Sequence, residues 1–167
     1  MFDDLTKKDI ENIEKEIEYR KTELRPKLIE AVKEARAQGD LSENFEYYAA
    51  KKEKNQNESR IRYLDRIVRT ANIIEDDSKD DEIGINTNVT LYIPEDDAEE
   101  KYRIVTTIRG DSLQGLISID SPMGKALLGH KTGDTVSIKV NDNYSYDVVV
   151  KEINKDSDES DDIIRKY

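Results

Sequence analysis

The chain has 167 residues, of which 39% are charged and only 35% are hydrophobic. This composition supplies too little apolar material for one large core and suits a thin helical hairpin joined to a small globular unit. The absence of cysteine excludes a disulfide framework and thiolate metal sites. The sequence also lacks a signal peptide and a long apolar run, which predicts a soluble, cytoplasmic protein with no membrane association.

Charge is distributed unevenly along the chain. Residues 1–75 contain 16 basic and 17 acidic residues, whereas residues 76–167 contain 11 basic and 21 acidic residues. Nearly all of the net charge of −11 therefore lies in the second half, and an acidic surface repels nucleic acid. Any contact with nucleic acid is expected from the first half, near the turn described next.

Two segments with helical spacing flank a turn at residues 39–44. Most of their apolar residues recur at steps of three, four or seven, as in an amphipathic helix. These residues are Ile10, Ile13, Ile17, Leu24, Leu28, Val32 and Ala35 before the turn, and Ala50, Ile61, Leu64, Val68 and Ala71 after it. Thr6 followed by Asp9 is typical of a capping box at a helix start, and Gly39 interrupts the pattern. We predict an antiparallel coiled-coil hairpin over residues 1–75.

Proline disturbs the first arm of this hairpin. Pro26 removes a backbone hydrogen bond and clashes with the preceding turn. We expect a kink there instead of a stop, because the apolar pattern resumes at Leu28. In a heptad frame the second arm has small or polar residues toward the turn, at Ala50, Lys54 and Asn57, and apolar residues toward its far end. Packing is therefore expected to be loose near the turn and firm at the base.

The second half of the chain predicts a separate domain. An acidic, apolar-poor linker covers residues 76–82, and beyond it the apolar spacing becomes alternating, as in a strand. Strands are expected around residues 89–93, 102–108, 116–119, 136–140 and 146–150. A short helix should start at Pro122, with Ser121 as its N-cap and Gly129 as its end. Residues 83–155 then form a small domain, the whole chain is of the α+β class, and residues 156–167 are an acidic tail.

Asp40 and Glu43 lie three residues apart in the predicted turn. One interpretation is structural: Asp-x-x-Glu at a helix start is a capping box, with Asp40 as the N-cap. Spacing alone favours this interpretation, because such caps are common wherever helices begin. The other interpretation is a pair of metal-binding carboxylates. Phe45, Tyr47 and Tyr48 are equally consistent with packing near the turn.

The sequence around this turn resembles the tip of the Gre transcript-cleavage factors of bacterial RNA polymerase. The matching stretch runs from Ala35 to Lys51 and contains Gly39-Asp40-Leu41-Ser42-Glu43-Asn44. Arg25-Pro26 also matches. Independently, Ser121-Pro122-Met123-Gly124-Lys125-Ala126-Leu127-Leu128-Gly129 with Gly133-Asp134 resembles the C-terminal domain of the same family. The resemblance extends over residues 5–153.

This resemblance implies an elongation factor whose coiled coil enters the secondary channel of a backtracked polymerase. An FKBP-like domain, an antiparallel sheet with one short helix, would dock at the channel entrance. It further implies that Asp40 and Glu43 are the catalytic pair, which shares a Mg²⁺ ion with the polymerase while the 3′ end of the nascent RNA is cleaved. The residues implied in RNA contact or tip support are Arg36, Ser42, Asn44, Tyr47 and Lys51. The residues implied in polymerase docking are Ser121, Pro122, Met123 and Gly124.

Two carboxylates alone hold Mg²⁺ weakly, because this ion needs six oxygen ligands. The isolated chain is therefore not expected to be an enzyme or to bind Mg²⁺ tightly, and we expect a monomer. Phe45 departs from the family, where a small residue is usual, and so does the stretch Thr106–Asp111, where a glycine followed by acidic residues is usual.

Two alternatives remain open. The first is a channel-binding regulator of RNA polymerase that modulates or inhibits without promoting cleavage, and the intact acidic pair argues against it. The second is a coiled-coil adaptor, which would leave the match at Ser121–Gly129 unexplained.

Overall fold

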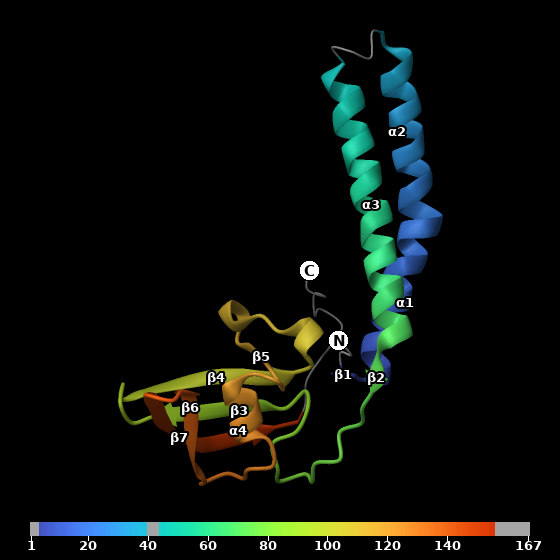
Figure 1. Cartoon of the computed structure of the whole chain (residues 1–167). Helices are drawn as coiled ribbons and strands as arrows, with labels where there is room; N and C mark the ends of the chain where they lie inside the picture. The colour runs from blue at the N-terminus through green and yellow to red at the C-terminus, as the bar shows by residue number, and fades with distance from the viewer. Residues whose placement is uncertain (1–3, 40–43, 156–167) are drawn as a thin grey trace. The chain divides into compact units, whose positions relative to one another are not determined.

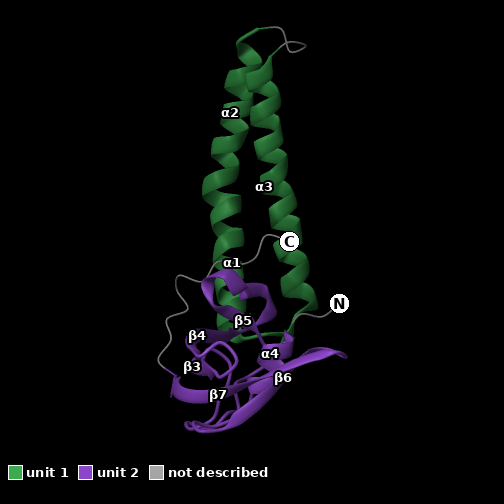
Figure 2. Cartoon of the chain, turned by 90° about the vertical axis from the view of Figure 1, so that its left-hand side faces the viewer, with its two compact units in different colours: residues 1–73 green, residues 74–167 purple. Residues whose placement is uncertain are grey.

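The computed structural model describes residues 4–39 and 44–155. The chain divides into two compact units, residues 1–73 and residues 74–167 (Figure 2). No helix within the described ranges is both long enough and apolar enough to cross a membrane.

The first unit is the predicted helical hairpin (Figure 1). Its first arm consists of α1 (Lys7–Tyr19), a π-helical turn (Arg20–Leu24) and α2 (Arg25–Ala37), and its second arm is α3 (Phe45–Thr70). At the base, β1 (Asp4–Leu5) and β2 (Asn72–Ile73) pair in parallel. The hairpin is thus closed at its base by backbone hydrogen bonds between segments nearly seventy residues apart.

Local sequence explains where the first arm begins and where it is distorted. The predicted capping box is confirmed: the Thr6 side chain accepts from the amide of Asp9, and the Asp9 carboxylate accepts from the amide of Thr6. A π-helical turn, Arg20–Leu24, lies just before α2, close to the position where the sequence predicted a kink, and the helix continues through Pro26. Because Pro26 has no amide hydrogen, the series of backbone hydrogen bonds along the helix is interrupted at this point. A wider turn, in which the amide of Arg25 donates to the carbonyl of Arg20, lets the helix continue.

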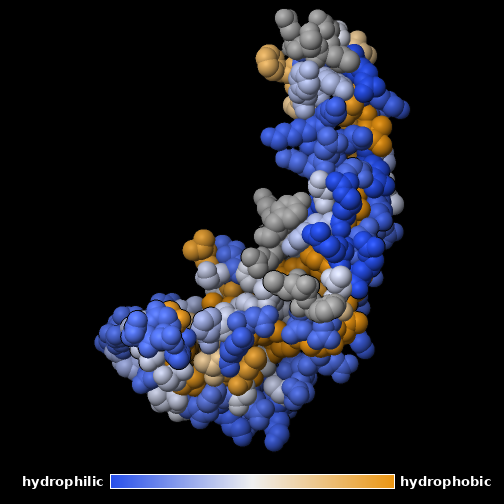
Figure 3. Space-filling view, viewed as in Figure 1, coloured by the Kyte–Doolittle hydropathy of each residue, from blue (hydrophilic) through white to orange (hydrophobic). Residues whose placement is uncertain are grey.

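The apolar contacts of the hairpin are concentrated toward its base. The buried apolar residues of the base half are Leu5, Ile13, Ile17, Ile61, Leu64 and Ile67, whereas the half near the turn buries Leu28, Ala35 and Tyr47. The heptad frame was wrong in the last turn of the second arm. It placed Val68 in the interface, but Ile67 is the buried residue there and Val68 is only half-buried. Much of the hairpin surface visible in Figure 3 is hydrophilic.

A polar layer crosses the middle of the hairpin. Arg60, which is 9% exposed, donates from Nε to Oε2 of Glu16 at 3.1 Å. Buried Asn57 accepts from Nη1 of Arg20 at 2.9 Å and donates to the Arg20 carbonyl at 3.3 Å. Because these contacts join residues 37 and 44 positions apart, they fix which turn of the first arm faces which turn of α3.

A second ion pair lies beside the polar layer, at the start of α2. Arg25 forms a two-point contact with Glu58, with distances of 2.7 Å and 2.9 Å. This contact couples the turn that contains Pro26 to the middle of α3, and two parallel charge-assisted hydrogen bonds give it a defined geometry.

The second unit is a five-stranded sheet with one short helix. The strand order is β5-β4-β3-β7-β6. The strands are β3 (Asn88–Ile93), β4 (Ala98–Val105), β5 (Leu116–Ser118), β6 (Thr135–Asn141) and β7 (Tyr144–Asn154), and the helix is α4 (Pro122–Leu127). Alternate residues of β3, namely Val89, Leu91 and Ile93, enter the core, as the sequence predicted. The predicted two-part α+β fold is confirmed.

The connection between β4 and β5 differs from the prediction. The strand expected to run through Ile108 ends at Val105, and two 3₁₀ turns follow, at Thr107–Arg109 and Ser112–Gln114. These turns carry the chain back so that β5 pairs with β4 in parallel, as a crossover connection allows. The sheet is therefore mixed, with antiparallel pairing at the other three interfaces.

Candidate functional site

The tip of the hairpin, formed by the end of α2 and the start of α3, holds most of the predicted site residues. Those that lie outside the described residues are Asp40, Ser42 and Glu43. Those that the structure describes are Arg36 in the last turn of α2, and Asn44, Tyr47 and Lys51 at the start of α3. The antiparallel arrangement of α2 and α3 brings these four residues together.

Asn44 is the N-cap of α3. Its Oδ1 accepts from the amide of Tyr47 at 3.0 Å. The interpretation of Asp40 as the N-cap is therefore wrong, because α3 begins at Phe45 and the cap position belongs to Asn44. Sequence alone could not separate the two, since Asn and Asp cap helices about equally well. Capping of α3 therefore gives no account of the acidic pair in the sequence.

Tyr47 lies among cationic side chains. It is buried, with the Arg36 guanidinium 5.6 Å and the Lys51 ammonium 5.9 Å from its ring centroid. The hydrogen bond with Arg36, followed by the charges of Lys51 and Lys54, lowers the pKa of the Tyr47 hydroxyl. Arg36 and Lys51 are themselves exposed. The tip therefore presents positive charge beside the segment that carries the two predicted carboxylates.

Two aromatic residues at the start of α3 face solvent. Phe45 is 85% exposed, and Tyr48 is 52% exposed and meets the Tyr47 ring edge-on at 5.5 Å between centroids. Phe45 therefore contributes almost nothing to the packing of the hairpin, which rules out the packing role that its sequence position allowed.

The described residues form no metal centre of their own. Within residues 4–39 and 44–155, no three His, Cys, Asp or Glu side chains gather closely enough to hold an ion. His130, the single histidine of the sequence, contacts Asp134 through Nδ1 at 3.1 Å. The amide of Lys131, and then His130, lower the pKa of Asp134. This pair stabilises the turn before β6.

The segment predicted to dock on a polymerase forms the start of α4. Ser121 is its N-cap: Oγ accepts from the amide of Gly124 at 3.0 Å and donates to the carbonyl of Ser118 at 2.6 Å. Gly124 is buried and Met123 packs against the core. Only Pro122 of the four predicted residues is exposed. Ser121 and Gly124 therefore serve the fold directly, and Pro122 offers the accessible surface.

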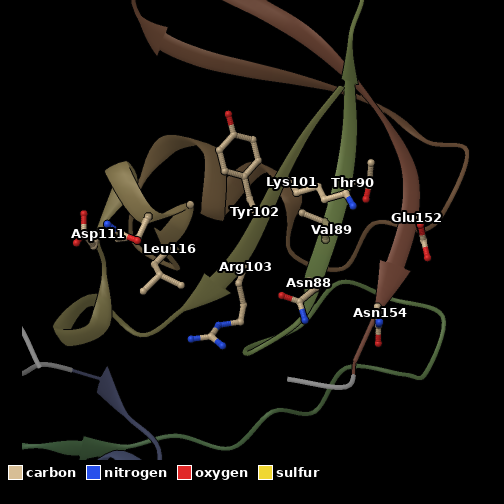
Figure 4. Close-up of a pocket in the computed structure, with 12 residues that line it drawn as sticks. Asn88, Val89, Thr90, Lys101, Tyr102, Arg103, Asp111, Leu116, Glu152 and Asn154 are labelled. Carbon is tan, nitrogen blue, oxygen red and sulfur yellow. The ribbon is translucent and has the colours of Figure 1, made fainter. Parts of the chain in front are cut away.

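A pocket of about 730 Å³ lies on the second unit, where β3, β4 and β7 meet the turn before β5 (Figure 4). Its charged lining residues are two cations, Lys101 and Arg103, and two anions, Asp111 and Glu152. The pocket therefore presents no single sign of charge to a ligand. None of the predicted site residues lines it.

Comparison with known proteins agrees with the two-part architecture. Residues 4–73 match the family described as "Transcription elongation factor, N-terminal", and residues 77–155 match the one described as "Transcription elongation factor, GreA/GreB, C-term". Transcription elongation factor GreA of Geobacillus kaustophilus (strain HTA426) is 44% identical over 136 residues, which are 81% of this chain and 86% of that protein. GreA of Macrococcus caseolyticus (strain JCSC5402) is 40% identical over 149 residues, 89% of this chain and 94% of that protein.

Among solved structures, GreA factor homolog 1 (Gfh1) of Thermus thermophilus is 29% identical. The match covers 92% of this chain and 99% of that chain, with a TM-score of 0.43. The two family matches together span nearly the whole chain, and relatives of 40–44% identity cover at least four fifths of it. The chain therefore belongs to the GreA/GreB family of bacterial transcription elongation factors.

Proposed function

We propose that this protein binds in the secondary channel of bacterial RNA polymerase and stimulates cleavage of the 3′ end of nascent RNA in backtracked complexes. The observation that carries the proposal is the construction of the tip. Asn44, and not Asp40, caps α3, so capping of this helix does not account for the two carboxylates that precede it in the sequence. Residues 40 and 43 are tethered at the end of a helix of 26 residues, which is about 39 Å long.

The surroundings of the tip support contact with RNA. Arg36 and Lys51 are exposed on either side of Tyr47, and cationic side chains bind phosphate without reading sequence. The second half of the chain is strongly acidic, so the proposed contact falls to the hairpin. The described part of the tip therefore offers positive charge for an RNA backbone, and the two carboxylates lie close to it in the sequence.

We further propose that Asp40 and Glu43 supply two oxygen ligands to a Mg²⁺ ion. Hard carboxylate oxygens are the donors that this ion prefers, and the remaining ligands would come from the polymerase, RNA phosphate and water. Such an ion activates water and stabilises the leaving oxygen in phosphodiester cleavage. The role of this chain is to hold the carboxylates in place, and the polymerase supplies the rest of the active site.

Docking is assigned to the second unit. Pro122 stands exposed at the first position of α4, on a turn held by the Ser121 cap. Pro122 is thus an apolar residue that a protein partner can reach on a turn of fixed geometry. We propose that Pro122 and its surroundings contact the polymerase at the channel entrance.

The test is cleavage of RNA in a purified backtracked complex, at saturating factor and low Mg²⁺. Asp40→Asn and Glu43→Gln should each lower the cleavage rate about a hundredfold or more, with binding to polymerase unchanged, because each removes one charged ligand. Raising Mg²⁺ should partly restore the rate. Glu46→Gln is the matched control: it removes a carboxylate from the first turn of α3, outside the proposed pair, and should leave the rate within about twofold.

Two results would contradict the proposal. Cleavage by Asp40→Asn at the wild-type rate would show that Asp40 is not a ligand. A wild-type protein that binds polymerase and slows RNA synthesis without shortening the RNA would instead be a channel-binding regulator.

A further inference from the structure

The side chain of Asn44 bonds to both arms of the hairpin. Its Oδ1 accepts from the amide of Tyr47 in α3 at 3.0 Å. Its Nδ2 donates to the carbonyl of Ala35 in α2 at 2.6 Å. An N-cap needs only the first of these bonds. The second is a direct link between the two arms at the tip.

The acceptor of this link is also part of the end of α2. The carbonyl of Ala35 accepts from the amide of Gln38, the C-cap residue, at 3.3 Å. The next residue, Gly39, has φ of 138°, a conformation that favours glycine. The end of α2 and the start of α3 are therefore joined at one carbonyl oxygen.

We propose that Asn44 is a positioning residue for the tip, a role that builds on the proposed function. By linking Ala35 to Tyr47 it fixes the end of α2 relative to the start of α3. Ala35 and Tyr47 are themselves buried, and the Asn44 side chain adds two directional hydrogen bonds to this packing. Glu43 directly precedes Asn44 in the sequence, so a change at Asn44 acts next to a proposed ligand.

Serine separates this role from capping. Asn44→Ser keeps a good N-cap acceptor, but its shorter side chain cannot bond Tyr47 and Ala35 at once. Asn44→Ala removes both bonds. Thr6→Ala is the matched control, because it removes the N-cap of α1 at the base of the hairpin and leaves the tip intact.

The first measurement is the maximal rate of RNA cleavage in backtracked complexes, together with the factor concentration that gives half of it. Asn44→Ser and Asn44→Ala should lower the maximal rate about tenfold, since small misplacements of reacting groups are costly, and should leave the half-maximal concentration unchanged. Thr6→Ala should change neither by more than about twofold. A wild-type maximal rate for Asn44→Ser, with a normal half-maximal concentration, would overturn the positioning role.

The second measurement does not depend on cleavage. The chain contains no cysteine, so spin labels can be placed at Ala37→Cys and Glu46→Cys, which flank the link. The distance distribution between them should be narrow in the parent protein, broader with Asn44→Ser, and unchanged with Thr6→Ala. Equal widths for the parent and Asn44→Ser would overturn the proposal. If the wild type stimulates no cleavage, the proposed function fails, while these distances still decide whether Asn44 holds the tip together.

Discussion

Glu16 and Arg60 should be strongly coupled in the stability of the hairpin. Arg60 is 9% exposed, and both of its contacts to the Glu16 carboxylate, at 3.1 Å and 3.4 Å, cross between the arms. Removing one partner of a fully buried ion pair costs about 3–5 kcal/mol. Since the Glu16 side chain is 28% exposed, water reduces this penalty, and we expect Glu16→Leu to cost about 2 kcal/mol.

Replacing both partners should behave differently from replacing one. Apolar residues of similar volume often substitute for a buried ion pair at little cost, so Glu16→Leu with Arg60→Met should lie within about 1 kcal/mol of the wild type. For a unit of this size, about 2 kcal/mol corresponds to a decrease in Tm of roughly 10 °C.

Urea and thermal unfolding followed by far-ultraviolet circular dichroism measure these values for the four proteins of the double-mutant cycle. The reasoning is refuted if the effects of the two single substitutions simply add, because residues that do not interact give additive changes.

Two further predictions concern the ends of α4 and α2. Gly124→Ala should destabilise the second unit by about 2 kcal/mol, because a Cβ at this position would meet the carbonyl oxygen of Ser118 at 2.0 Å; a urea midpoint as high as in the wild type would contradict this. Arg25 lowers the pKa of Glu58 below its ordinary value of 4.5, so their ion pair contributes fully above that pH and is lost as the pH falls through the lower folded pKa. The stability advantage over Glu58→Gln should therefore shrink below about pH 4.5, and an advantage independent of pH down to the acid transition would count against the ion pair.

The elements that depend on local patterns could be predicted from the sequence. The capping box of Thr6 and Asp9 requires only residues three apart, and the Ser121 cap with Pro122 at the first helical position is equally local. The alternation along β3 follows from one buried face of a sheet. In each case the physical constraint acts within a few residues, so the sequence displays it directly.

The features that depend on distant partners could not be predicted in this way. The N-cap of α3 is Asn44, whose side-chain amide also donates to the carbonyl of Ala35 across the hairpin. No spacing rule predicts such a contact. Asn57 in the heptad frame of the second arm was a signal of the polar layer, but its partner Arg20 lies 37 residues away. The prediction of a strand through Ile108 was wrong. The apolar alternation in the sequence continues past Val105, but the strand ends there and a 3₁₀ turn follows.

The uneven distribution of apolar contacts along the hairpin has a consequence for how it folds. A hairpin with strong contacts beside its turn can close from the turn outward, one short loop at a time. Here the firmest contacts, among Ile13, Ile17, Ile61 and Leu64, lie far from the turn. The pairing of Leu5 with Ile73 lies farther still. We expect the arms to meet first at their distant ends, which requires a large loop to close before the contacts that stabilise it form. We then expect the end of α2 and the start of α3 to pair after the base and to separate before it.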